Sequence, residues 1–375
     1  MRLPENLFID EIDALASAYA DRHGRRPINV SHWDPSDEFV RSMRQSIPIP
    51  EIERPVQYRY SYMVDEKKAV LAKLGISSQN ASCLFTENGS MSISAIANWL
   101  SANATARVVL LSPSYFTTKY NLNRLGIEVV EEHLSRDGGN YHWPNGTSIK
   151  SPDVLWVTNP VYNTGDYSLE KYAERLIKIA DSGVRVVLDE TLAITPTHFA
   201  GNLIGHKNIV GIYTPHKAVC LNALKFSIVA LPQDEEDFFD DWGDILFGGL
   251  SGSASAAIKH YISPQFDTYR DAFIRHVEAA RSWHAALISQ HSDKIETDAG
   301  VRGHFLSVYF PQLDAHLGAS LPFMEDILEA TGAIFIPGSR SSFDPSLGLC
   351  FRINLSLDSL QFRGSVARLY KRLAA

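Results

Sequence analysis

The sequence predicts an α/β fold: a large domain with a mostly parallel sheet covered by helices on both faces, plus a smaller α/β domain. Two observations support this prediction. Short β-rich apolar runs alternate with helical stretches through the middle of the chain, and the pattern changes in the last third. Strands that alternate with helices favour a parallel sheet that is buried on both faces.

Five apolar runs are expected to be strands of the large sheet: 107–112, 154–159, 184–189, 209–214 and 226–232. The stretch 168–183 between two of them has a helical pattern. Ligands of such sheets bind beyond the carboxyl ends of the strands. We therefore expect the chemistry near the polar residues that end four of the runs: Ser112, Asn159, Asp189 and Thr214.

The last third begins with a long amphipathic stretch, 268–290, that predicts a connecting helix. Three further apolar runs, 304–310, 333–338 and 349–356, then alternate with helical segments and indicate the smaller domain. We expect the large domain to span 46–265. The small domain would combine 1–45 with 266–375, since the first residues precede the first helix of the large domain.

Composition indicates the class of protein. The chain has 375 residues, 45% of them hydrophobic and 21% charged, as in an ordinary globular protein. No apolar run reaches membrane-spanning length, and the start lacks the layout of a signal peptide, so a cytoplasmic location without membrane partners is expected. The net charge of −8 argues against nucleic acid. Cys83, Cys220 and Cys350 are too scattered for a disulfide framework or a metal site.

The residues that carry chemistry start with Lys217, in T-P-H-K directly after the run 209–214. A desolvated lysine at a strand end is neutral, nucleophilic and able to react with a cofactor aldehyde. Taken alone, a lysine is usually a solvated surface residue. The interpretation therefore depends on the motifs around it.

Three other motifs suggest charged ligands. Asp189 ends a buried strand, where a carboxylate is costly unless it is paired. The turn TENGSMS, 86–92, precedes a helix and presents free N–H groups to an anion. Arg352 lies inside an apolar run and needs an anionic partner. The plain alternatives for the first two are a turn or a helix cap.

In their order along the chain, these motifs resemble those of the class I/II aminotransferases, fold type I of the pyridoxal-phosphate enzymes. The resemblance covers nearly the whole chain. The resemblance implies an aminotransferase-like fold type I, with pyridoxal 5'-phosphate held by Lys217 as a Schiff base. Thr214 and Lys225 take the positions three residues before and eight after the lysine. The family usually has arginine at the second position, for the cofactor phosphate. Asp189 would pair with the pyridine nitrogen.

The resemblance assigns further residues. Tyr115, in SPSYF, would stack on the pyridine ring, with Phe116 as the alternative. Arg352 would bind the substrate α-carboxylate with two parallel hydrogen bonds. Trp33 lies where the family often has a small residue over the substrate. The phosphate would lie on the turn residues Gly89, Ser90 and Met91, with Ser92 as a further candidate.

Two segments imply a homodimer with shared active sites, on the resemblance alone. Tyr58, with Tyr60 as a rival, lies where the family places a tyrosine that reaches the phosphate of the neighbouring subunit. The loop 248–255 matches one that crosses the subunit interface, where Ser251 or Gly252 would approach the partner's site.

The turn NPVYNTG, 159–165, departs from the family pattern NPxNPTG. The family's second asparagine, a donor to the phenolic oxygen of the cofactor, aligns with Tyr162. Either Tyr162 replaces it or a one-residue shift brings in Asn163. A second family donor, a tyrosine, is replaced by Leu192. Fewer donors to an ionised oxygen raise the proton affinity of the site.

The expected function is therefore a reaction at the Cα amine of an L-amino acid, first of all transamination. Elimination or replacement, cyclisation, decarboxylation and oxidation remain open on the same fold. A catalytically silent binding protein is disfavoured, because Lys217, Asp189 and Arg352 are all present. A nucleotide-binding α/β enzyme is set aside, because no G-x-G-x-x-G or Walker-type run follows an early strand.

Overall fold

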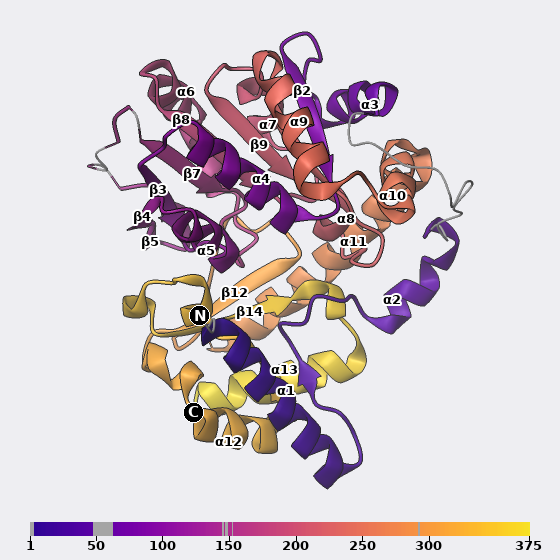
Figure 1. The fold of residues 1–375 in the computed structure, drawn as a ribbon. Helices are drawn as coiled ribbons and strands as arrows, with labels where there is room; N and C mark the ends of the chain where they lie inside the picture. Colours follow the sequence, from indigo (N-terminus) through magenta and orange to yellow (C-terminus); the bar gives the residue numbers. More distant parts are fainter. Residues whose placement is uncertain (1–3, 48–62, 145, 147–148, 152, 292) are drawn as a thin grey trace.

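The computed structural model describes residues 4–47, 63–144, 146, 149–151, 153–291 and 293–375. Figure 1 shows two parts: an upper part built on a large sheet and a lower part with smaller sheets. Among the described helices, none is long and apolar enough to cross a membrane.

The large sheet has seven strands in the order β2-β10-β9-β8-β7-β3-β4. Strand β10 runs antiparallel to both of its neighbours, and the other pairs are parallel. All five runs predicted from the sequence are strands of this sheet. In chain order the strands are β2 (Ala81–Thr86), β3 (Arg107–Ser112), β4 (Glu128–His133), β7 (Val154–Thr158), β8 (Arg185–Glu190), β9 (Ile209–Tyr213) and β10 (Ser227–Pro232).

Helices cover both faces of this sheet, as expected. One face packs on α4 (Gly89–Ala102), α5 (Phe116–Arg124) and α9 (Glu236–Phe247), where Leu110 and Val187 meet Ile96. On the other face, Val109 and Leu188 belong to the main core. Side chains alternate between the two faces because successive residues of a strand point in opposite directions. That second face carries α3 (Val64–Leu74), α6 (Ala173–Asp181), α7 (His198–Leu203) and α10 (Gly252–Ile262).

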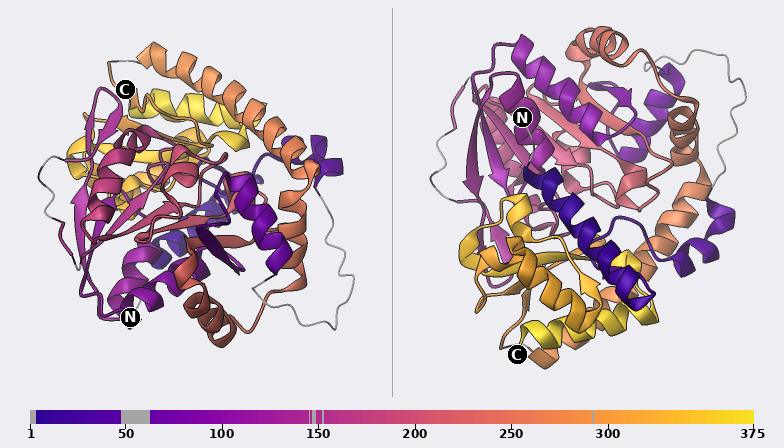
Figure 2. Two further views of the ribbon diagram at one scale, coloured as in Figure 1. Left: turned by 90° about the horizontal axis from the view of Figure 1, so that it is seen from above. Right: turned by 60° about the horizontal axis from the view of Figure 1, so that its bottom comes forward.

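The connecting helix α11 (Pro264–Ile288) starts four residues before the stretch predicted from the sequence. It lies beside α13 (Leu360–Leu373), with His284 against Phe362 and Tyr370 (Figure 2). The expected domain boundary at residue 265 falls in its first turn. The division into two domains therefore stays a prediction, although the two parts are evident in Figure 1.

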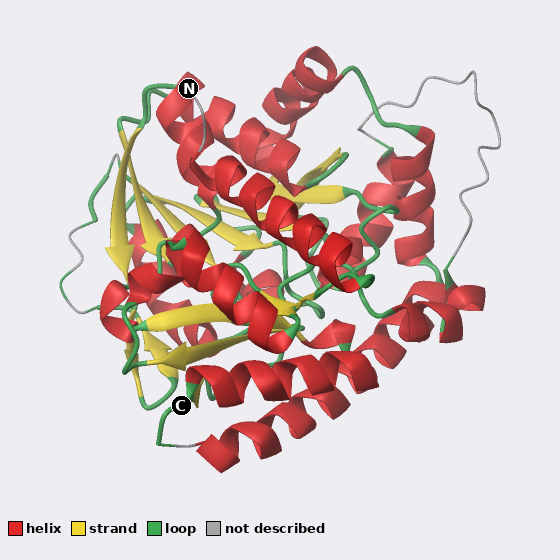
Figure 3. Cartoon of the chain, turned by 90° about the horizontal axis from the view of Figure 1, so that it is seen from below, coloured by secondary structure: helices red, strands yellow, loops and turns green. Residues whose placement is uncertain are grey.

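The lower part contains a three-stranded antiparallel sheet of β11 (Glu296–Thr297), β12 (Phe305–Phe310) and β14 (Leu349–Asn354). Of the run 333–338, only β13 (Ala333–Ile334) forms a strand, and it pairs with β1 (Ile28–Asn29) near the start of the chain. Figure 3 shows helices lying over these strands. The remaining elements are α1 (Pro4–His23), α2 (Asp37–Ser42), β5 (Ser135–Asp137), β6 (Asn140–His142), α8 (Pro215–Ala218) and α12 (Leu321–Thr331).

Candidate functional site

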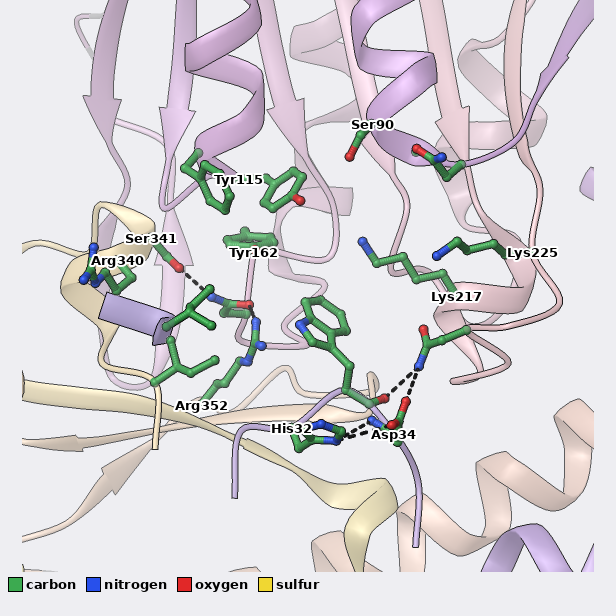
Figure 4. Close-up of a pocket in the computed structure, with 18 residues that line it drawn as sticks. His32, Asp34, Ser90, Tyr115, Tyr162, Lys217, Lys225, Arg340, Ser341 and Arg352 are labelled. Atoms are coloured by element: carbon green, nitrogen blue, oxygen red, sulfur yellow. Dashed lines mark hydrogen bonds and ion pairs between the residues drawn. The ribbon is translucent and has the colours of Figure 1, made fainter. Parts of the chain in front are cut away.

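A cavity of about 480 Å³ lies between the two parts (Figure 4). The large-sheet part contributes Gly89, Ser90, Tyr115, Phe116, Tyr162, Asn163, Lys217 and Lys225, and the other wall includes Trp33, Ser341 and Arg352. A second cavity, of about 20 Å³, shares five of these residues and is also lined by Asp189. The structure thus brings together residues from segments more than 300 positions apart in the sequence.

Lys217 lies on α8, the short helix that follows β9, and its side chain points into the cavity (Figure 4). Its Nζ atom is 4.7 Å from the ring centre of Trp33 and 5.4 Å from that of Tyr115. Burial lowers the pKa of Lys217 to about 8, against an upward effect of Asp189. An amine with this pKa is far more often neutral near neutral pH than an ordinary lysine, and so is a better nucleophile.

Asp189 is buried at the end of β8. The backbone N–H of Thr191 donates to its Oδ1 atom at 3.1 Å. Burial raises the pKa of Asp189, while the hydrogen bonds of Thr191 and the charge of Lys217 lower it. A buried carboxylate beside a cavity can accept a hydrogen bond from a protonated ring nitrogen, and that partner would offset its desolvation.

The turn at the start of α4 forms a cradle at the cavity. Gly89 and Ser90 line both cavities. A Cβ atom at Gly89 would come within 3.3 Å of Thr214 Oγ1, so glycine keeps this approach open. Lys225 lines the same cavity and supplies a positive charge. The cradle suits a phosphate group, which binds at helix N-termini and near lysine.

Three other candidates for the phosphate are engaged elsewhere. The N–H of Met91 donates to the capping side chain of Asn88 at 3.1 Å. The hydroxyl of Ser92 is buried and donates to Ser227 at 2.8 Å. Thr214 also donates to Ser227, at 3.1 Å, and its Oγ1 atom lies next to Gly89. Sequence reasoning could not separate these roles, because the cap and the buried serine network depend on packing between α4 and β10.

Of the two aromatic candidates, Tyr115 lines both cavities and Phe116 only the larger one. The ring of Tyr115 lies 5.5 Å from that of Tyr162, and Phe116 packs edge-on against Tyr115 at 4.9 Å. This arrangement favours Tyr115 as the residue that stacks on a ring held between Lys217 and Asp189.

Tyr162 and Asn163 have different surroundings. Asn163 has a φ of 64°, its Oδ1 atom accepts from Arg352 Nη1 at 2.7 Å, and its Nδ2 atom donates to Ser341 Oγ at 2.5 Å. Tyr162 lines both cavities and packs with Leu192. Burial raises the pKa of Tyr162, and the nearby Arg352 opposes this rise. Both residues therefore interact with the arginine, and the tyrosine also borders the space next to Asp189.

Arg352 is buried on β14, and one edge of its guanidinium is already occupied. Its Nε and Nη2 atoms donate to the carbonyl oxygen of Ser31 at 3.2 and 3.1 Å. Its Cζ atom lies 4.3 Å from the ring centre of Trp33 and 4.6 Å from that of Phe305. Burial lowers the pKa of Arg352, and no carboxylate of the described residues is among the groups that act on it. Nη1 also donates to Asn163, and Tyr162 is a further hydrogen-bonding partner of the guanidinium. An incoming carboxylate would bind the N–H groups of Nη1 and Nη2 that these contacts leave over.

Several lining residues were not expected from the sequence. The side chain of Asn222 donates to the carbonyl oxygen of Trp33 at 3.1 Å and to Asp34 at 3.2 Å. Its position five residues after Lys217 is the only signal that could have suggested it. Ser31 acts through its carbonyl oxygen, which no side-chain pattern reveals. Ile9, His32, Asp34, Ile336, Arg340 and Ser341 also line the cavity.

The expected dimer contacts stay predictions. Tyr58 and Tyr60 lie outside the described residues. In the loop 248–255, the N–H and hydroxyl of Ser251 donate to the carboxylate of Glu87 in the turn 86–92. This loop therefore lies beside the cradle of its own chain. In the part of the chain that the structure describes, no group of three or more His, Cys, Asp or Glu could hold a metal ion.

The chain was compared with known proteins. No protein-family model and no curated protein sequence matches it. Its structure is similar to that of a mutant of the Thermus thermophilus aspartate aminotransferase, with a TM-score of 0.77 and 15% identity over 100% of this chain and 97% of that one. The chain has the fold-type-I aminotransferase fold.

Two other structures show how far this likeness reaches. Escherichia coli YbdL, described with a methionine aminotransferase function, has a TM-score of 0.75 and 14% identity over 96% of each chain. The pyridoxal-phosphate-dependent cyclase OrfR has a TM-score of 0.73 and 16% identity, again over 96% of each chain. At these identities the likeness concerns the fold, and the same fold supports more than one reaction.

Proposed function

We propose that the protein is a pyridoxal-phosphate-dependent enzyme that acts on the Cα amine of an L-amino acid, and that its reaction is transamination. The observation that carries this proposal is the arrangement around the cavity: the buried amine of Lys217, the buried carboxylate of Asp189 and the buried guanidinium of Arg352. A cytoplasmic location and a homodimer with shared sites are part of the proposal, on the resemblance of the sequence.

The residues fit the cofactor. When bound, pyridoxal phosphate supplies an aldehyde and an electron-withdrawing ring. Asp189 would hold a proton on the ring nitrogen, and Tyr115 would cover one face of the ring. Gly89, Ser90 and Lys225 would hold the phosphate. Lys217 would bind the aldehyde carbon and, once released, would take and return the proton at the Cα atom of the substrate.

Arg352 orients the substrate. Its outer edge would bind the α-carboxylate with two parallel hydrogen bonds. The carbonyl oxygen of Ser31 and the side chain of Asn163 hold the guanidinium in place. The arginine therefore needs no rearrangement when the substrate binds, which favours affinity because less side-chain freedom is lost.

A second reaction class has one specific observation in its favour. Leu192 borders the smaller cavity and cannot donate a hydrogen bond. A site with one donor fewer than the family pattern suits elimination or replacement, cyclisation, decarboxylation or oxidation as alternatives. A silent binding protein of the same fold is the remaining alternative. Both are separated from transamination by the products formed.

The experiment combines trapping with product analysis. Borohydride reduction of the protein with bound cofactor, followed by peptide mapping, should find the pyridoxyl group on Lys217, and Lys217→Ala should lose it. The matched control is Lys207→Ala, at an exposed position, which should keep it. A label on Lys225 or Lys207 would show that the central assignment is wrong. A panel of L-amino acids should then give 2-oxo acids, and other products would indicate another reaction.

A further inference from the structure

The part of the cavity that the proposed cofactor residues leave unassigned contains an exposed isoleucine. Ile9, on α1, has 43% of its surface exposed. It is one of five large hydrophobic residues exposed in the described part of the chain, with Tyr120, Ile245, Leu246 and Leu360, and of these only Ile9 lines the cavity. An exposed apolar side chain at a binding cavity gains stability when an apolar ligand covers it.

A second aliphatic residue, Ile336, lies next to the carboxylate-binding arginine. Its N–H donates to the hydroxyl of Ser31 at 2.9 Å. The carbonyl oxygen of the same serine accepts from Arg352 at 3.1 and 3.2 Å. Ile336 also lines the cavity. A substrate held on Arg352 would therefore have an aliphatic surface beside it.

Aromatic residues form another part of the cavity wall. Phe116 and Tyr115 form an edge-on pair at the cavity. Trp33 lies within 4.7 Å of Lys217 Nζ and 4.3 Å of Arg352 Cζ, so it borders the two groups that would fix the amino and carboxylate ends of the substrate. Its ring packs edge-on against Phe305 at 4.9 Å, and its carbonyl oxygen is bound by Asn222. Because Trp33 is held on both sides, it acts as a fixed wall rather than as a movable one.

Four polar residues in this part of the cavity are engaged with one another or with other groups: His32, Asp34, Asn222 and Arg340. Asp34 accepts from Asn222 and lies 3.6 Å from the ring nitrogen of His32. Arg340 also interacts with another group. A charged side chain on the substrate would therefore compete with existing contacts, whereas an apolar one would not.

From these contacts we infer that the substrate side chain is apolar and extended, and that Ile9, Ile336 and Phe116 bind it while Trp33 closes the opposite side. The inference rests on the proposed function, since Arg352 and Lys217 must hold the two ends of the amino acid. The expected substrates are therefore amino acids with long unbranched or aromatic side chains. The rival class is the acidic amino acids, whose side-chain carboxylate would bind Arg340.

The test measures the first half of the reaction, in which one amino acid is mixed with the cofactor-loaded protein and the visible absorption is followed. L-alanine, L-2-aminobutyrate, L-norvaline and L-norleucine add one methylene at a time. The second-order rate constant should rise roughly fourfold per methylene, which corresponds to about 0.8 kcal/mol. L-aspartate and L-glutamate should react more slowly than L-norvaline and L-norleucine.

Matched variants locate the effect. Ile9→Ala, at an exposed position where folding loses little, should flatten the series, so that the rate falls far more with L-norleucine than with L-alanine. Ile336→Val is the milder second variant, and it should reduce the rate with L-norleucine more than that with L-alanine. Leu360→Ala removes an aliphatic side chain outside the cavity that is 89% exposed, more than Ile9, and should leave the whole series as in the parent.

Two results would overturn the inference in different ways. If L-alanine reacts but the series is flat, or if L-glutamate is faster and Arg340→Gln removes that advantage, the side chain is not apolar and the proposed function still stands. If no amino acid in the panel, including L-alanine, changes the absorption, the proposed function fails and the inference falls with it.

Discussion

Arg352 and Asn163 are joined by a hydrogen bond of 2.7 Å from Nη1 to Oδ1, which connects β14 to the turn after β7. The other half of the Asn163 amide binds Ser341, so both ends of this side chain are engaged on the substrate side of the cavity. Tyr162, one residue earlier, lines the smaller cavity together with Asp189. Asn163 thus lies on the Arg352 side of the cavity, and Tyr162 reaches from Arg352 to the side of Asp189.

The first prediction tests this division of roles. Tyr162→Phe removes only a hydroxyl that can donate one hydrogen bond to the phenolic oxygen of the cofactor. The pH at which the visible absorption of the lysine-linked cofactor titrates should rise, because the proton then remains as the main partner of that oxygen. Asn163→Ala should leave this titration unchanged and weaken amino-acid binding through Arg352. If Tyr162→Phe titrates like the parent and Asn163→Ala shifts, the two roles are reversed.

The second prediction concerns Arg352. Replacement by alanine removes a charge-assisted bidentate contact of about 1.5–3 kcal/mol, so amino-acid affinity should fall roughly tenfold or more. Arg352→Lys keeps the charge but not the fork, and should also bind more weakly than the parent. The spectrum of the bound cofactor should stay the same in both. Arg372→Ala, at an ion pair with Asp326 on the surface, is the control. Unchanged affinity in Arg352→Ala would contradict the assignment.

The third prediction follows from the pKa of Lys217, lowered to about 8 mainly by burial. The neutral amine is the reactive form, so covalent capture of pyridoxal phosphate by the cofactor-free protein should speed up with pH and level off above about pH 8. A solvated lysine would continue to gain up to about pH 10.4. Borohydride trapping at timed intervals between pH 6 and 10 measures this rate. A rate that still rises between pH 9 and 10 would show that the amine is not desolvated.

The fourth prediction concerns Glu190, buried beside Asp189 and bound by the side chains of Asn159 and Thr197. Burial raises the pKa of Glu190 to about 7. The folded protein therefore holds a proton that the unfolded chain releases above about pH 4.3. The stability linked to this proton is complete below pH 4.3 and is lost as the pH rises through about 7.

Urea unfolding at pH 5 and pH 8 checks this effect. Relative to Glu190→Gln, which stays neutral, the parent should lose on the order of 2–3 kcal/mol of unfolding free energy between the two pH values. Glu278→Gln, at an exposed position on α11, should follow the parent. Equal pH dependence of the parent and Glu190→Gln would show that Glu190 titrates normally.

The sequence by itself determined the sheet and the order of the motifs along it. Alternating apolar runs and helical stretches predicted five of the seven strands of the large sheet, because hydrophobic periodicity is a local property that packing reinforces. Asp189 and Arg352 could be singled out from their positions at the end of and inside apolar runs, since a charged group in such a place requires a partner. The role of Lys217 depended on the resemblance of the motifs around it. The short pairing of β1 with β13 was not predicted, because a two-residue strand has no pattern of its own.

Only the tertiary structure decided which neighbours the candidate residues meet. Met91 and Ser92 appeared equivalent to Gly89 and Ser90 in the sequence, but a helix cap and a buried hydroxyl network engage them. Asn163 turns toward Arg352 because its backbone has a positive φ at the turn. From the start of the chain, the Ser31 carbonyl reaches Arg352 and Ile9 reaches the cavity. These contacts join residues that are far apart in the sequence. They depend on the direction of the backbone in loops, and composition and periodicity do not show that direction.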